Sequence, residues 1–258
     1  MDSSLLFVVA VTRWAGSGPE SSCLQALAPV LGLSAYDLRL KLAGPVPVVL
    51  HIRLDEERCR QVLDLLDAHG CKGLALGADE LVGSSALLHA RDFELGSESL
   101  IARDGERERS LDWTEILALV KATLSTEQES SKTIKQRKSV VRIRKQRRLL
   151  TDSTEEREQA VYVVPSDFAQ TVVLREHRLR YAGLGERAGM TKTENFTALV
   201  AELRLRAGSA LFDERLLSAK RIGSPGAVLG RRESSSSNIS DTDLAVHFLV
   251  AAHTRGAL

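Results

Sequence analysis

The stretch DEERCRQVLDLLDAHGCKGLALG, residues 55–77, decides the fold of the first half of the chain. Its apolar side chains recur at i, i+3, i+4 and i+7, the spacing of one buried helix face, and are Cys59, Val62, Leu63 and Leu66. Asp55 precedes this pattern and is suited to begin the helix, while Gly70 follows its last turn, as helix ends prefer. The segment after Gly70 is short, apolar and typical of a strand. The stretch therefore predicts a helix that leads directly into a strand.

The residues before this stretch add two strands and two short helices. Residues 5–11, LLFVVAV, form a continuous apolar run that is typical of a fully buried strand, and residues 47–54 have the same character. One of the serines at 21–22 is placed to begin a first helix, which we expect to end or kink at Pro29 because an interior proline costs a helix about 3 kcal/mol. Ser34 is placed to cap a second helix. The predicted order is β-αα-β-α-β, a small α/β sandwich.

This order, a Gly-Leu-Ser turn at residues 32–34 and a basic residue on the second helix resemble the C-terminal domain of the bacterial ribosomal stalk protein. The adaptor of the bacterial Clp protease shares that fold. The resemblance covers roughly residues 4–79. In the stalk family a Gly-Leu-Gly turn and nearby lysines contact translation factors, whereas this chain has Ser34 in place of the second glycine and Tyr36 where a lysine is expected. The resemblance implies a helical face that touches other proteins, and its candidate protein-binding residues are Gly32, Leu33 and Arg39.

The second half of the chain is predicted to consist of short strands closed by one helix. Strand patterns separated by Gly and Asp-Gly turns cover residues 93–95, 99–102, 107–113, 160–164 and 171–181, and residues 116–124 fit either a helix or a strand. Thr193 is placed to cap a helix that ends at Gly208 and whose apolar stripe is Phe196, Leu199, Val200 and Leu203. A meander of strands followed by an amphipathic helix resembles a pleckstrin-homology-like barrel.

The end of the chain changes character again. Residues 223–240, GSPGAVLGRRESSSSNIS, have the Gly- and Ser-rich composition of a flexible linker. A short helix is predicted from about residue 242 to residue 253. We expect this tail to make few contacts and to be dispensable for folding, with docking of Leu244 and Phe248 on an exposed groove of a neighbouring domain or protomer as the alternative. The predicted fold class is α+β: a stalk-like α/β domain over residues 1–85, a pleckstrin-homology-like β-barrel domain with a C-terminal helix over 91–210, and a flexible linker with a short tail helix over 223–258.

A strongly basic segment is the most distinctive feature of the surface chemistry. Between residues 132 and 148 the chain has nine basic residues and no acidic one, namely Lys132, Lys135, Arg137, Lys138, Arg142, Arg144, Lys145, Arg147 and Arg148. One interpretation is an extended element with a solvated basic face, in which the acidic residues just before and after the segment reduce the repulsion between its positive charges. The other is a site for nucleic acid or anionic lipid, which needs only Lys and Arg for phosphate contact. The absence of Phe, Tyr and Trp between residues 113 and 162 argues against binding of single-stranded RNA, because the bases of single strands usually stack on aromatic rings.

The net charge, the cysteine count and the remaining motifs do not indicate an enzyme. The net charge is +1 from 35 basic and 34 acidic residues, so no global field attracts nucleic acid or anionic membrane. The Gly16-Ser17-Gly18-Pro19 loop lacks the lysine and glycines of phosphate-binding loops. The three scattered cysteines are expected to be small buried hydrophobes in a reducing compartment, and no CxxC or HxxxH pair suggests a metal site. We predict no catalytic residue, cofactor or metal, and no transmembrane segment.

The interpretation that fits best is a non-enzymatic, cytoplasmic protein-interaction scaffold with a protein partner. The first alternative is binding of nucleic acid or anionic lipid through the basic segment 132–148, and the second is an enzyme whose site the spacing of residues does not reveal. Salt dependence separates the scaffold from the first alternative, since neutralising several phosphates makes affinity fall steeply as salt rises.

Overall fold

The structure is a computed structural model that describes residues 6–44, 46–131, 151–218 and 240–258. It is a mixed α and β protein whose strands form three sheets with the orders β2-β1-β3, β11-β8-β9-β10-β4 and β5-β6-β7. We call them sheet A, sheet B and sheet C. The coarse α+β prediction is therefore confirmed.

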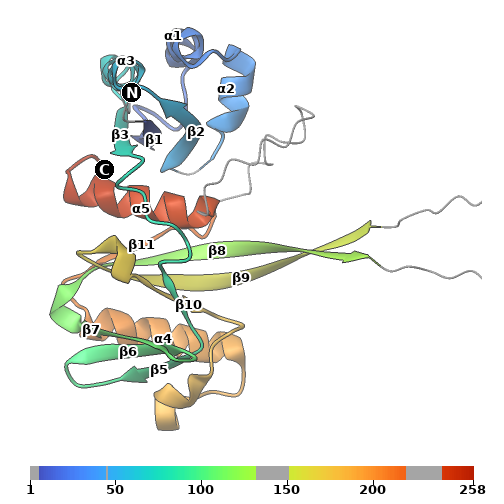
Figure 1. Ribbon diagram of the computed structural model, residues 1–258, viewed down its shortest axis with the longest axis vertical. Coiled ribbons are helices and arrows are strands. Elements are labelled where there is room, and N and C mark those ends of the chain that lie inside the picture. The colour runs from blue at the N-terminus through green and yellow to red at the C-terminus, as the bar shows by residue number, and fades with distance from the viewer. Residues whose placement is uncertain (1–5, 45, 132–150, 219–239) are drawn as a thin grey trace, which may run out of the picture.

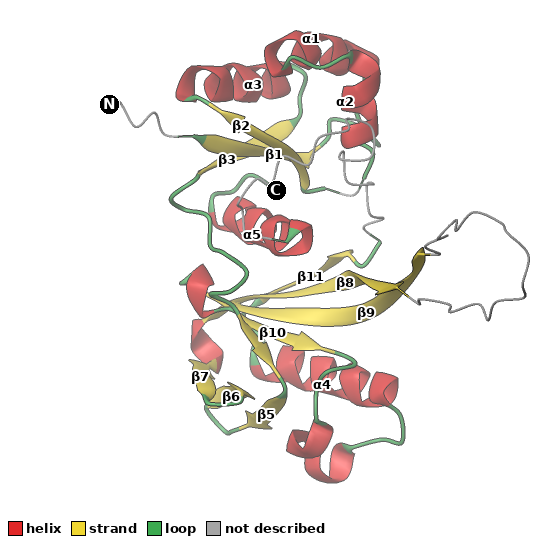
Figure 2. Ribbon diagram, turned by 45° about the vertical axis from the view of Figure 1, so that its right-hand side comes forward, coloured by secondary structure: helices red, strands yellow, loops and turns green. Residues whose placement is uncertain are grey.

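Sheet A and its helices have the predicted β-αα-β-α-β order. The elements are β1 (Phe7–Arg13), α1 (Ser21–Leu31), α2 (Ala35–Lys41), β2 (Val48–Leu54), α3 (Glu56–Ala68) and β3 (Lys72–Gly77). The central β1 pairs antiparallel with both neighbours. The three helices lie together on one side of this sheet (Figure 2), and their apolar stripes join Val9 and Val11 of β1 in one buried cluster.

Most of the local signals in sheet A act as predicted. The side chains of Ser34 and Asp55 cap α2 and α3 by accepting hydrogen bonds from backbone N–H groups three residues later, and Gly70 has the left-handed φ of +69° that a helix end favours. The prediction that a serine caps α1 is wrong. This helix begins at Ser21 after Glu20, which gives no side-chain cap, and it continues past Pro29 to Leu31. The helix thus ends two residues after Pro29.

Sheet B is the largest sheet and is buried on both faces. It contains β4 (Leu88–Ala90), β8 (Ile116–Ser131), β9 (Thr151–Pro165), β10 (Val172–Arg175) and β11 (Leu211–Leu216). The ambiguous segment 116–124 is thus a strand. Pairings among β8, β9 and β10 are antiparallel, while the edge strands β4 and β11 pair parallel with β10 and β8. Alternate side chains of β9 enter two different cores, which explains why Ala160–Val164 is apolar throughout.

Sheet C and α4 (Lys192–Arg206) cover one face of sheet B. Sheet C is an antiparallel meander of β5 (Asp92–Leu95), β6 (Ser99–Asp104) and β7 (Arg107–Asp112), close to the predicted strands. The predicted apolar stripe of α4 is buried, but its capping box uses Thr191, not Thr193. The predicted strand 171–181 is too long, because β10 ends at Arg175 and the short helix η3 (Tyr181–Arg187) follows a turn.

The predicted barrel is not confirmed. In the described residues sheet B runs from the edge strand β11 to the edge strand β4, and no pairing joins these two edges. Its strands include parallel pairs at both edges, whereas a meander that closes on itself has antiparallel neighbours throughout.

The prediction that the tail makes few contacts is wrong. The helix itself is present as α5 (Asp241–Thr254), but it lies between sheet A and sheet B as a layer that both sheets share (Figures 1 and 2). Leu244, Phe248 and Ala252 pack on sheet A, while Val246, Leu249 and Val250 pack on sheet B. Five layers result: helices α1–α3, sheet A, α5, sheet B, and α4 with sheet C. The Gly- and Ser-rich segment before α5 lies mostly outside the described residues.

Polar contacts hold the end of α5 and the last residues against sheet A. Arg255 pairs with Glu80 at 2.5 Å and donates to the Ala75 carbonyl oxygen at 3.4 Å. Thr12 of β1 donates a hydrogen bond to the Ala257 carbonyl oxygen. Both ends of the described chain therefore meet at sheet A.

Candidate functional site

The three candidate protein-binding residues lie at the two ends of α1, not in one cluster. Gly32 ends α1 with a left-handed φ of +65°, and Leu33 is partly buried against the core of the α1–α3 layer. Arg39 of α2 reaches the other end of α1, where its Nη2 donates to Ser21 Oγ at 2.9 Å. An 11-residue helix is about 16 Å long, so the turn and the arginine are separated by that distance.

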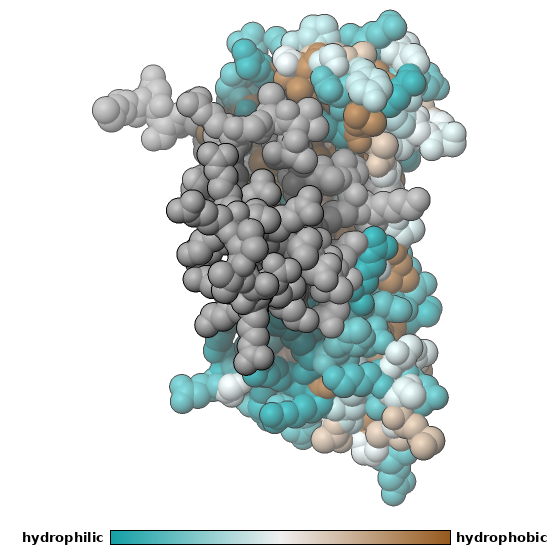
Figure 3. Space-filling view, turned by 90° about the vertical axis from the view of Figure 1, so that its right-hand side faces the viewer, coloured by the Kyte–Doolittle hydropathy of each residue, from teal (hydrophilic) through white to brown (hydrophobic). Residues whose placement is uncertain are grey.

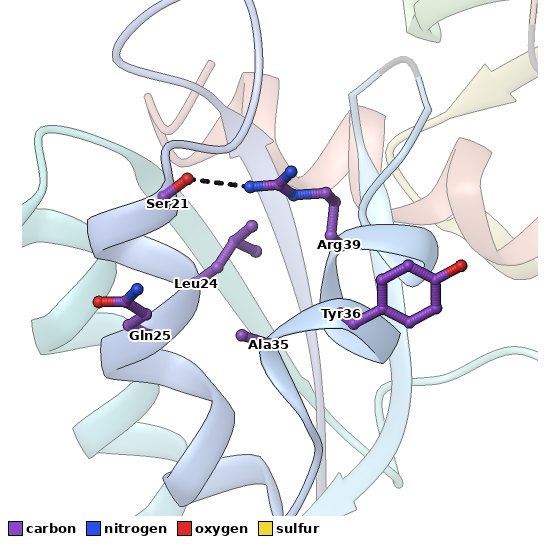
Figure 4. A pocket seen from close by; sticks show the side chains of 6 residues that line it. All are labelled: Ser21, Leu24, Gln25, Ala35, Tyr36 and Arg39. Atoms are coloured by element: carbon purple, nitrogen blue, oxygen red, sulfur yellow. Dashed lines mark hydrogen bonds between the residues drawn. The ribbon is translucent and has the colours of Figure 1, made fainter.

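A shallow groove of about 220 Å³ lies between α1 and α2 near Arg39. Its lining residues are Ser21, Leu24, Gln25, Ala35, Tyr36 and Arg39. Figure 4 shows Arg39 spanning the gap between the helices, with Leu24 pointing into it from α1. The groove is open and small, so it suits a side chain of a partner better than a whole cofactor.

Helix α2 is apolar on two opposite sides. Leu38 and Leu42 are completely buried in the core, while Tyr36 and Leu40 are 70% and 51% exposed. Tyr36 and Leu40 are four residues apart and so lie on the same face of the helix. Figure 3 shows hydrophobic side chains among hydrophilic ones at the end of the molecule that α1 and α2 form. In the sequence, Tyr36 and Leu40 each precede one residue of the buried pair by two positions, and a shift of two residues in a helix places them on the opposite side from this pair.

Positive charge lies next to the exposed apolar pair. Arg39 is exposed and Lys41 is partly exposed, and within the described part of the chain neither is in an ion pair. Asp37, the acidic residue between them and the helix start, is held by Ser34, whose hydroxyl donates to it at 2.6 Å. We call Tyr36, Arg39, Leu40, Lys41 and the adjoining groove the α2 face.

The basic segment lies outside the described residues, so its nine Lys and Arg residues stay a prediction. The described arms on either side of it are β8 and β9. Pairing of β8 with β11 ends at Ala122 and pairing of β9 with β10 ends at Ala160, yet the two arms pair with each other up to Ser131↔Thr151. They extend as a ribbon past the rest of sheet B (Figure 1). The register places Glu127 opposite Glu155, so this pair of flanking acids is aligned across the ribbon.

Sequence reasoning missed a buried polar cluster where α5 meets sheet B. The Asp243 carboxylate, 3% exposed, accepts hydrogen bonds from Tyr162 Oη at 2.7 Å and from the Ser84 hydroxyl. Ser84 Oγ in turn accepts from the backbone N–H of Ser240 at 2.9 Å. Burial, and then the Asp243 carboxylate, raise the pKa of Tyr162 well above its usual range. No spacing rule predicts this cluster, since its members come from distant parts of the chain.

His89 of β4 lies near Ser84 and Asp243 of this cluster, but the three do not have the geometry of a catalytic triad. In a triad the imidazole lies between the hydroxyl and the carboxylate. Here Ser84 donates directly to Asp243, and the buried Nδ1 of His89 has no hydrogen-bond partner among the described residues. The arrangement can anchor the first turn of α5 to β9 and to the segment before β4. We therefore assign it a structural role.

We predict that Tyr162→Phe destabilises the protein by about 1–3 kcal/mol, because it leaves one oxygen of a buried carboxylate without its donor. Tyr36→Phe is the matched control: it removes the same hydroxyl from a side chain that is 70% exposed and is expected to change the free energy of unfolding by less than about 0.5 kcal/mol. Urea unfolding measures both. Equal midpoints for Tyr162→Phe and the wild type would contradict the role given to the cluster.

The cysteines and the rest of the described residues add no second chemical site. Cys23, Cys59 and Cys71 are free and buried, as predicted. Burial raises the pKa of Cys23 to about 11, and the neighbouring thiol of Cys71 adds to this effect. Among the described residues no group of three or more His, Cys, Asp or Glu is placed to hold a metal ion, and no helix has the length and apolar content needed to cross a membrane. Compared with protein-family models, curated proteins and solved structures, the chain shows no match.

Proposed function

We propose that the chain is a non-enzymatic, cytoplasmic protein-interaction scaffold that docks a protein partner on the α2 face. The observation that carries the proposal is the pair of exposed apolar side chains, Tyr36 and Leu40, on a helix whose other side is fully buried. Tyrosine and arginine are enriched among the residues that dominate binding energy at protein interfaces, and Tyr36 and Arg39 occur together here. We also propose the stalk-like fold for roughly residues 4–79 and a relation of the second half to pleckstrin-homology-like barrels.

The proposal is supported by how the α2 face is held. Leu38 and Leu42 fix α2 against the core, and the Ser34 cap and the Arg39–Ser21 hydrogen bond fix its two ends. A partner therefore meets side chains on a preformed helix, which lowers the entropy lost on binding. The α2 face lies on the opposite side of sheet A from α5, so a partner can reach it without displacing the shared helix.

The test is site-specific crosslinking in the cell from which the chain comes. A photoreactive phenylalanine analogue at position 36 or 40 is expected to capture the same protein. The matched controls are positions 190 and 205, where Met190 and Leu205 are 99% and 77% exposed on other parts of the surface. Capture of one protein at both α2 positions and at neither control supports the proposal. Capture of that protein at the control positions alone would place the interface elsewhere.

With the captured partner in hand, we predict that Tyr36→Ala weakens binding by about 30-fold, the equivalent of roughly 2 kcal/mol for a central aromatic contact. Met190→Ala is expected to leave the dissociation constant within about twofold. Titration calorimetry with both variants measures the difference. Folding is not expected to change, because both side chains are mostly exposed. An unchanged affinity for Tyr36→Ala contradicts docking on the α2 face.

A second candidate is binding of nucleic acid or anionic lipid through residues 132–148, and the β8–β9 ribbon favours it. The nine pairs from Thr123↔Gln159 to Ser131↔Thr151 extend the arms by about 30 Å beyond the neighbouring strands. The basic segment is therefore joined to the far end of a ribbon, away from the core. We rank this candidate second because its charged residues lie outside the described part of the chain.

We predict that replacing Arg142, Arg144, Arg147 and Arg148 by Gln leaves the melting temperature and the partner affinity unchanged. The measurement compares this variant with the wild type for binding to duplex DNA, single-stranded RNA and anionic vesicles at about 50 and about 200 mM salt. The second candidate requires wild-type affinity to fall by about 10³-fold over that range if six or more phosphates are engaged, and to be lost in the variant. That pattern with any of the three ligands makes the second candidate the function.

A further inference from the structure

The helix α5 places an ionisable ring in the layer between the two sheets. His247 lies against Phe168, with ring centroids 4.0 Å apart and planes only 8° from parallel. Phe168 belongs to the same buried cluster as Val246 and Leu249 of α5. A charge on His247 would therefore lie at an apolar contact between α5 and sheet B.

Two charged groups face His247, and they oppose each other. Glu80, from the segment after β3, attracts a protonated imidazole, and Arg255 repels it. These two side chains are paired with each other at 2.5 Å, and the other oxygen of Glu80 accepts from the backbone N–H of Gly77 at 2.7 Å. The Glu80 carboxylate therefore already has a partner on each of its two oxygens. Burial dominates and lowers the pKa of His247 to about 4.

A second imidazole lies on the strand β4, in register with a residue of the cluster that α5 packs against. His89 of β4 is opposite Val173 in the sheet, and its Nδ1 is buried with no partner among the described residues. The groups around it are the Asp243 carboxylate, which favours protonation, and Arg175 and Arg178, which oppose it, together with the Ser84 backbone. Burial is the largest effect and lowers the pKa of His89.

We infer that α5 is an acid-releasable helix, which leaves its seat between the sheets when the histidines at that seat take up protons. Both rings are neutral in the docked state and protonate more readily when the helix is free. A group whose pKa is lower in the docked state stabilises docking at neutral pH and loses that contribution as the pH falls below its ordinary value near 6.5. Release uncovers apolar residues of both sheets, while residues 219–239 keep the helix attached to β11. The device is independent of the α2 face.

The expected size of the effect follows from His247. With a pKa near 6.5 when free and about 4 when docked, the population of the released state rises about 25-fold between about pH 7.5 and about pH 5. The contribution of His89 adds to this figure.

The test is amide hydrogen exchange of the full chain at these two pH values, corrected for the intrinsic exchange rate. The protection factor of residues 241–254 is expected to fall by about 25-fold or more. His247→Phe keeps a ring against Phe168 and cannot titrate, so most of the fall is expected to disappear. His253→Gln, an exposed change on the same helix, is the matched control and is expected to behave as the wild type.

Two results would overturn the inference: equal protection of α5 at both pH values, or an undiminished fall in His247→Phe. A direct titration of the His247 ring by NMR in the wild type gives the same decision without a variant. A midpoint near 4 supports the acid-releasable helix, and a midpoint near 6.5 contradicts it.

Discussion

A chain that lacks residues 240–258 is expected to lose cooperative folding. Six apolar residues of α5 that are at most 8% exposed would be removed from the layer between the sheets: Leu244, Val246, Phe248, Leu249, Val250 and Ala252. Burial of a large apolar side chain contributes about 1.5–3 kcal/mol, so the loss is on the order of 10 kcal/mol. This equals the whole stability of a typical domain, about 5–15 kcal/mol.

The measurement is urea unfolding of the truncated chain, followed by circular dichroism and by binding of a dye that reports exposed apolar surface. Adding a synthetic peptide of residues 240–258 is expected to restore a cooperative transition, because the seat on both sheets is then refilled. The same peptide with Phe248→Ala is the matched control and is expected to restore much less. A truncated chain that unfolds with the wild-type midpoint would show that α5 is an appendage.

In the full chain, Phe248→Ala is expected to destabilise the protein by about 3–5 kcal/mol, because it opens a cavity under a side chain that is completely buried. The cluster around it on sheet A, which includes Val8, Val49 and Leu76, is itself buried and is expected to relax only in part into the space. His253→Ala, on the exposed side of the same helix, is expected to change stability by less than about 0.5 kcal/mol. Urea unfolding of the two variants at neutral pH makes the comparison, and similar midpoints would contradict the packing described for α5.

The elements of sheet A were predictable because short-range signals specify them. The stripe of Cys59, Val62 and Leu66 faces the core, and Asp55 and Gly70 mark the ends of α3 as expected. The continuous apolar run in β1 was also informative. It indicated burial on both faces, yet only one face could be assigned to the predicted helices α1 and α3.

The partner of the other face of sheet A was not predictable in the same way. Its cover is α5, which is joined to it through more than 160 residues of intervening chain, and no local rule links such segments. Low-complexity residues before α5 suggested a free tail, although composition describes only the linker and not the helix after it. Two sequence features did indicate a buried shared layer. The apolar run in β9 is continuous, and the apolar residues of α5 lie on more than one side of the helix.

The candidate site, too, was predictable only in part from the sequence. Arg39 was identified from a resemblance, and the structure places it at the groove between α1 and α2. Tyr36 and Leu40 were passed over because exposure of an apolar residue depends on which side of a short helix is buried. The cluster of Ser84, Tyr162 and Asp243 depends on three-dimensional assembly alone.

The central claim is that α5 joins sheet A and sheet B into one cooperative unit that presents the α2 face. Scanning calorimetry of the full chain at neutral pH tests it most directly. The account predicts a single transition whose calorimetric and van't Hoff enthalpies agree, a ratio of about 1. Two separate transitions, with Phe248→Ala leaving both temperatures unchanged, would show that the two halves fold independently and would contradict it.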